Sequence, residues 1–105
     1  MNKIICFLLC ILSATSFSQP VAEKPKILYG TCTKDSLLAD PFSKWFITGY
    51  DSYTPTTAVL NALKKQNTIG ISVKVFFGTW CGDSKREVPR FLKTLSAISF
   101  AEKNI

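Results

Sequence analysis

Cysteine is the residue type in this chain that offers the most reactive chemistry. The 105-residue sequence holds four cysteines, Cys6, Cys10, Cys32 and Cys81, and no histidine. Without an imidazole, Ser/His/Asp hydrolysis, Cys/His proteolysis and zinc sites that need histidine are excluded. The chemistry left open is that of thiols and of disulfides, which persist mainly in oxidising compartments.

The first eighteen residues have the pattern of a secretory signal. Lys3 supplies the positive start, residues 4–12 form an apolar run, and the small residues of 16–18 predict cleavage before Gln19. The apolar run reaches only about 14 Å as a helix, half of a hydrocarbon core, so no stable membrane span is expected after cleavage. The segment 1–18 therefore predicts export to the periplasm, the cell envelope or the medium.

Cleavage would also remove two of the four thiols. Cys6 and Cys10 lie in the signal segment, so Cys32 and Cys81 are the thiols of the mature chain. A lipoprotein signal modified at Cys10 is the less favoured interpretation, because the bulky Leu9 stands where such signals resemble one another in having a small residue.

The charge balance does not indicate nucleic-acid binding. The chain carries 13 Lys and Arg against 7 Asp and Glu, a formal net charge of +6. Its basic residues gather in nothing longer than the pairs Lys64-Lys65 and Lys85-Arg86. Such pairs are typical of solvated helix faces, so nucleic acid is not an expected partner.

The elements that must position the thiols alternate between strand and helix. A proline-bearing linker (19–26) precedes a predicted strand over 27–32. The aromatic stretch 35–53 is expected to cover a core as short helical turns and loops. The alternative is that its aromatic side chains form a platform for a ligand. A helix is predicted from Thr54, capped by that residue, and ending before Gly70. The apolar run 71–77 predicts a buried strand, and a second helix follows from about Gly82 through Leu95. This order favours an α/β fold with parallel strands.

The segment Phe76-Phe77-Gly78-Thr79-Trp80-Cys81-Gly82-Asp83-Ser84-Lys85, with Pro89 eight residues after Cys81, resembles the active-site segment of the thioredoxin family. The resemblance is convincing over about 69–95. It implies a thioredoxin-like domain over 27–105 that is partial: a β-α-β-α half with parallel strands, in which the C-terminal β-hairpin and last helix are missing. A truncated frame or a compact variant both fit this expectation.

The resemblance implies roles for the residues around Cys81. Cys81 is the expected nucleophile, Trp80 an apolar cover and Pro89 a structural kink. Gly82, Asp83 and Lys85 surround the thiolate, and the family's second active-site cysteine is replaced by Ser84.

A cysteine at a strand-to-helix junction also has a physical reason to be reactive. Unpaired N–H groups and the helix dipole stabilise its thiolate and lower its pKa. Lys85 and Arg86 are expected to add to this effect and Asp83 to oppose it. Ser84 can donate a hydrogen bond to the thiolate, but a hydroxyl cannot attack a mixed disulfide to release the bound partner.

Cys32 is the one candidate for a resolving thiol. It could serve only if its α-carbon lay within about 7 Å of that of Cys81; the alternative is a strand-end cysteine without a redox partner. Two thiols without histidine fall short of a zinc site, so neither a metal nor a cofactor is expected.

The sequence thus predicts an exported thiol protein that forms mixed disulfides through Cys81 with protein or small-molecule thiols and disulfides. As an enzyme it would be a thiol-disulfide oxidoreductase lacking the second cysteine. The alternatives are a redox-inactive binding or scaffold module of thioredoxin fold, favoured by Ser84 and by Val75 where many of these proteins have an aspartate, and a non-functional fragment.

Overall fold

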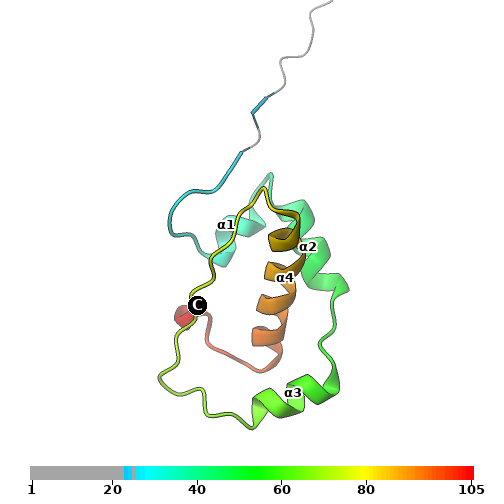
Figure 1. Cartoon of the computed structure of the whole chain (residues 1–105), viewed down its shortest axis with the longest axis vertical. Helices are drawn as coiled ribbons and strands as arrows, with labels where there is room; N and C mark the ends of the chain where they lie inside the picture. Colours follow the sequence, from blue (N-terminus) through cyan, green and yellow to red (C-terminus); the bar gives the residue numbers. More distant parts are fainter. Residues whose placement is uncertain (1–22, 25) are drawn as a thin grey trace, which may run out of the picture.

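Helices are the regular structure of this protein over residues 23, 24 and 26–105, which the computed structural model describes (Figure 1). Their bounds are α1 (Lys34–Leu38), α2 (Ser43–Ser52), α3 (Thr57–Lys64), α4 (Gly82–Ala97) and the short 3-10 helix η1 (Glu102–Asn104). The aromatic stretch 35–53, expected as short helical turns and loops, forms α1, α2 and the turn between them.

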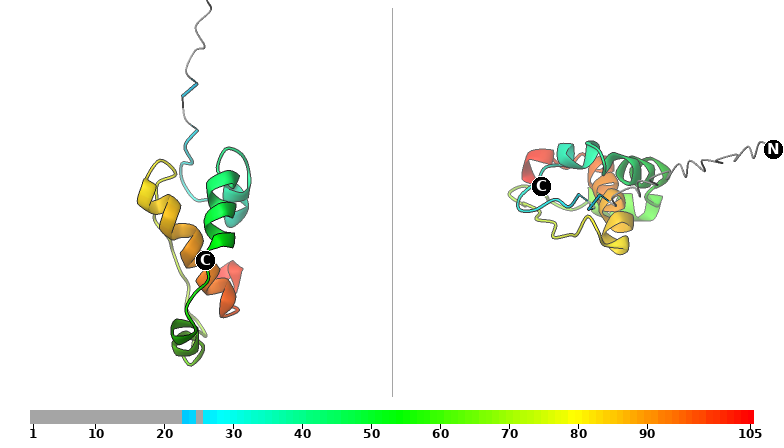
Figure 2. Two further views of the ribbon diagram at one scale, coloured as in Figure 1. Left: turned by 90° about the vertical axis from the view of Figure 1, so that its right-hand side faces the viewer. Right: turned by 90° about the horizontal axis from the view of Figure 1, so that it is seen from above.

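The most extensive contact between helices is that of α2 with α4, which lie next to each other (Figures 1 and 2). It is close because a glycine of α2 faces a proline of α4: a Cβ built on Gly49 would stand 2.7 Å from Cγ of Pro89. Pro89 lies inside α4 and is fully buried. The predicted kink proline is therefore also the residue on which α2 rests.

An apolar core lies between α1, α2 and α4. Its buried members are Leu37, Phe42, Phe46, Val88 and Leu92. Phe46 is 1% exposed and its ring lies edge-on to that of Trp45, with the ring centres 6.0 Å apart. Side chains of both predicted strands, among them Leu28, Val75 and Phe77, pack against this core.

The predicted parallel sheet is absent from the described residues, so the thioredoxin-like α/β fold expected from the sequence is wrong. The segments 27–32 and 71–77 contain no strand. Instead of bonding to each other, the amide of Leu28 donates to Oγ1 of Thr79 and that of Val73 donates to the carbonyl of Asn104. A pair of short parallel strands is too small to be stable by itself, and here side-chain and terminal groups take its bonds.

The burial expected for 71–77 is wrong as well. Val75 and Phe77 are half-buried, but Phe76 is 92% exposed. In a parallel α/β sheet, helices would cover both faces of this run, whereas here helices cover one face.

Helix α3 begins later than predicted and stands apart from the other helices (Figure 1). Its N-cap is Thr56, whose hydroxyl accepts a hydrogen bond from the amide of Val59, and not Thr54. None of its residues is buried.

The predicted signal 1–18 lies outside the described residues, as does most of the linker 19–26. Within the described part of the chain, no helix combines the length and the hydropathy needed to cross a membrane.

Candidate functional site

Cys81 is the N-cap residue of α4. Its backbone is extended (φ −85°, ψ 125°), and its carbonyl accepts the first helical hydrogen bond, from the amide of Lys85 at 3.0 Å. Its own amide donates to the carbonyl of Gly78 at 3.0 Å. A turn from Gly78 thus delivers the half-buried thiol to the place where the first amides of the helix have no backbone partner.

The surroundings lower the pKa of the Cys81 thiol. Hydrogen bonding from the backbone N–H of Ser84 has the largest effect, followed by the Ser84 hydroxyl and the N–H of Asp83, and desolvation and the Asp83 carboxylate oppose them. No capping hydrogen bond of ordinary geometry closes on the sulfur. The donors therefore face the sulfur without binding it tightly, and they favour its charged form.

Ser84 has a second contact that the sequence did not suggest. Its Oγ accepts a hydrogen bond from the amide of Gly78 at 3.2 Å. Since a hydroxyl that accepts through a lone pair keeps its proton, the Ser84 O–H remains available for the thiolate. Ser84 therefore ties the loop before Cys81 to the first turn of α4 and lowers the pKa of the thiol at the same time.

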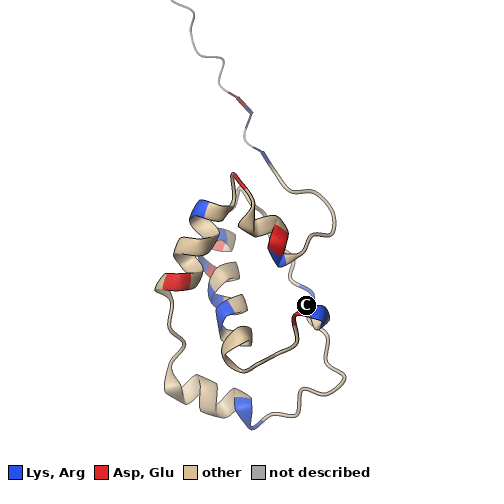
Figure 3. Ribbon diagram, turned by 180° about the vertical axis from the view of Figure 1, so that it is seen from behind, with Lys and Arg blue, Asp and Glu red and all other residues tan. Residues whose placement is uncertain are grey.

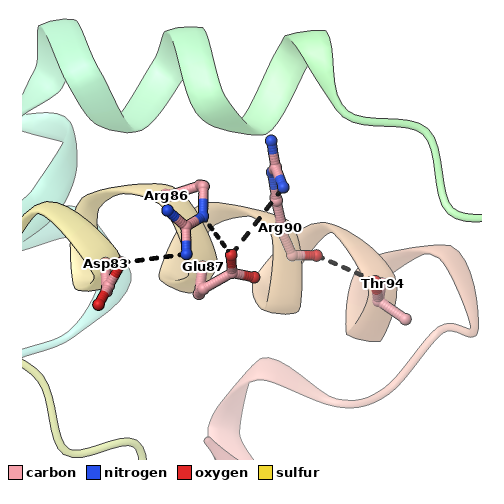
Figure 4. Close-up of polar contacts among 5 residues, drawn as sticks. All are labelled: Asp83, Arg86, Glu87, Arg90 and Thr94. Atoms are coloured by element: carbon pink, nitrogen blue, oxygen red, sulfur yellow. Dashed lines mark hydrogen bonds and ion pairs between the residues drawn. The ribbon is translucent and has the colours of Figure 1, made fainter.

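The charged residues of the first turns pair with one another rather than with the sulfur. Arg86 bonds Asp83 at 3.0 Å and Glu87 at 2.6 Å, and Arg90 lies 3.9 Å from Glu87 (Figure 4). Acidic and basic residues are accordingly mixed along the first turns of α4 (Figure 3). The i,i+3 spacing of Asp83 and Arg86, and of Glu87 and Arg90, was the sequence signal for two of these three ion pairs.

Lys85 and Arg86, which were expected to stabilise the thiolate, contribute less to the lowered pKa of Cys81 than predicted. The lowered pKa of Cys81 is caused by donors on Ser84 and Asp83, and neither Lys85 nor Arg86 is among its causes. Lys85 acts here through its backbone, which donates to the carbonyl of Cys81.

Trp80 lies beside the thiol but leaves it open. Its indole is 71% exposed and folds back over Gly78, where an added Cβ would stand 2.9 Å from Cε2 of the ring. Gly82, the first residue of α4, has open space around its Cα. The approach to the sulfur is thus bordered by an exposed aromatic ring and by backbone.

Two grooves flank the segment 75–77, and Cys32 lines one of them. The Cys32 groove, about 490 Å³, lies on the side of η1 and is lined by Cys32, Lys34, Glu102 and Ile105 among others. The Ser84 groove, about 590 Å³, is lined by Ser84, Tyr53, Phe76, Glu87 and Phe91 among others. Cys32 and Cys81 are both free thiols, so no disulfide joins them, and Cys32 is not among the residues that line the Ser84 groove.

Over the described residues, no group of three or more His, Cys, Asp and Glu side chains is placed to hold a metal ion. The arrangement around Cys81 can stabilise a thiolate at the accessible N-terminus of α4.

Comparisons with protein-family models, with curated proteins and with solved structures find no match to this chain. The resemblance to the thioredoxin family therefore stays a likeness of one short motif, without the sheet that carries this motif in that family.

Proposed function

We propose that Cys81 is a thiolate nucleophile that forms mixed disulfides with protein or small-molecule partners. The observation that carries the proposal is the position of its sulfur at the start of a sixteen-residue helix, facing donors from Asp83 and Ser84 that lower its pKa. A lower pKa increases the fraction of thiolate, the reactive form, near neutral pH.

The reaction needs a partner that carries a disulfide. The Cys81 thiolate attacks one sulfur of that disulfide, a new S–S bond forms to Cys81, and the other partner sulfur leaves as a thiolate. Since Ser84 cannot attack the new bond, the mixed disulfide persists until an external thiol releases it. Export, which the segment 1–18 predicts, would bring the protein to a compartment where partner disulfides are stable.

The rate of alkylation by iodoacetamide as a function of pH tests the proposal. We expect the rate at Cys81, followed by mass spectrometry of its peptide, to reach half its maximum below the value of about 8.5 for a free thiol. The Cys81 peptide from urea-unfolded protein is the matched reference, and Cys32 is an internal comparison. A half-maximum in the folded protein at or above that of the unfolded chain would contradict the proposal.

A binding module without thiol chemistry is the second candidate. Phe76 and Trp80, 92% and 71% exposed, offer aromatic contact area near the site. The variant Cys81→Ser distinguishes the two functions. A binding module would still bind its partners in this variant, whereas a thiol protein would no longer capture them as mixed disulfides.

A further inference from the structure

The Cys32 groove is lined by two segments that are far apart in the chain. Residues 32–35, which lead into α1, contribute Cys32 and Lys34, and the segment 101–105, which contains η1, contributes Glu102 and Ile105. Apolar side chains of the core, Leu37 and Leu92 among them, also line this groove. The position of the segment 101–105 therefore controls access to Cys32 and to part of the core.

Two hydrogen bonds join the segment 101–105 to other parts of the described chain. The Lys34 ammonium donates to Oε1 of Glu102 at 2.6 Å, and this ion pair connects the two segments that line the groove. The amide of Val73 donates to the carbonyl of Asn104 at 2.7 Å, so that η1 lies beside the extended segment 71–77 (Figure 1). No residue of η1 is buried, so apolar packing adds little to these two bonds.

The backbone before the segment 101–105 remains attached to α4. The amides of Ser99 and Phe100 donate to the carbonyls of Ser96 and Leu95, both at 3.0 Å, as at the C-terminal end of many helices. Ser99 has a φ of 58°, in the left-handed region, and it turns the chain away from the helix. The segment 101–105 can therefore move about this point without unwinding α4.

We propose that the segment 101–105 is a lid of the Cys32 groove and that the ion pair Lys34–Glu102 holds it closed. When the ion pair separates, the bond between Val73 and Asn104 opens with it, and Cys32 becomes accessible. The side chains of Lys34 and Glu102 are 30% and 67% exposed, and a pair so open to water is weak and is screened by salt. The lid therefore opens while the core stays folded. No step of this motion uses Cys81, so the lid is independent of the proposed thiol function.

Amide hydrogen exchange of Val73, followed by NMR in the full chain, tests the lid. We expect Glu102→Ala to speed this exchange about threefold, because the ion pair that holds the lid is lost. Glu87→Ala is the matched control, since it removes a carboxylate from the ion pairs on α4 instead. The amide of Phe46, which donates to the carbonyl of Phe42 in the core, reports on unfolding and is expected to exchange at an unchanged rate.

Salt and alkylation provide two further measurements. About 0.5 M salt should speed exchange at Val73 in the unaltered chain but not in Glu102→Ala, where no ion pair is left to screen. Alkylation of Cys32 by iodoacetamide, followed by mass spectrometry of its peptide, should also be about threefold faster in Glu102→Ala than in the unaltered chain or in Glu87→Ala.

Unchanged exchange at Val73 in Glu102→Ala would overturn the lid, and so would an equal increase at Phe46, which would show that the whole fold had opened. Faster exchange at Val73 with unchanged alkylation of Cys32 would overturn its control of the groove. The same effect of salt in Glu102→Ala as in the unaltered chain would overturn the role of the ion pair.

Discussion

At the scale of single residues, the candidate site depends on Ser84 more than on any cation. The resemblance to thioredoxins treats Ser84 as the residue that stands in for a lost cysteine. In the structure it is a donor that lowers the pKa of Cys81 and an acceptor for the amide of Gly78. Ser84 thus favours the thiolate of Cys81, although its own hydroxyl cannot attack a mixed disulfide.

Ser84→Ala tests this role. The backbone N–H of Ser84, which has the largest effect, remains in the variant, but the hydroxyl is lost, so the pKa of Cys81 is expected to rise toward that of the unfolded chain. The pH at half-maximal alkylation should increase. Loss of the partner for the Gly78 amide should also cost about 1 kcal/mol in urea unfolding. Ser96→Ala, an exposed serine in the last turn of α4, is the control; an unchanged alkylation profile in Ser84→Ala would contradict the assignment.

At the scale of elements, the contact between α2 and α4 holds the site in place. Pro89 is buried within α4, and Gly49 of α2 leaves it the room that it needs. Because Cys81 is the N-cap of α4, the packing of α2 on Pro89 fixes the helix whose N-terminus faces the thiol.

Gly49→Ala should therefore destabilise the protein although alanine favours helices. A Cβ at 2.7 Å from Cγ of Pro89 forces the two helices apart, at a cost of about 1–3 kcal/mol, which exceeds a propensity gain of about 1 kcal/mol. The matched control is Gly82→Ala, where the added Cβ meets open space. The free energy of unfolding in urea checks both variants, and equal stability of the two would refute the close contact.

At the scale of the whole molecule, one face of the extended segment 71–77 is covered and the other is open. Helices α1, α2 and α4 enclose the core, on which Val75 and Phe77 rest. Beyond that core, Ile69, Phe76 and Trp80 are 89%, 92% and 71% exposed. Stability is thus concentrated in a small cluster around Phe46.

Phe46→Ala should remove most of that stability. The ring is 1% exposed and in contact with Trp45 and Tyr50, so its loss leaves a cavity that costs about 3–5 kcal/mol. Ile47→Ala, next in the chain but 44% exposed, should cost less than about 1 kcal/mol. Thermal unfolding followed by circular dichroism compares them, and similar melting temperatures for the two variants would show that the core does not centre on Phe46.

The sequence predicted those features that are decided within a few residues. The spacing of Val88, Phe91, Leu92 and Leu95 predicts the last helix, which the structure has as α4. The Trp-Cys-Gly turn before it predicts a thiol at a helix start, and Cys81 is the N-cap. Local periodicity and the unpaired amides of a first helical turn suffice for both predictions.

Tertiary structure decided the rest, because it depends on partners distant in the chain. The runs 27–32 and 71–77 are strand-like in composition, but a strand exists only when another backbone bonds to it, and here Thr79 and Asn104 take bonds that a ladder would need. Likewise, no local pattern shows that Gly49 meets Pro89, that Ser84 holds Gly78, or that Cys32 lines a groove beside η1. By itself the sequence determined a thiol at the start of a helix; long-range hydrogen bonding and packing determined that this helix belongs to a helical fold.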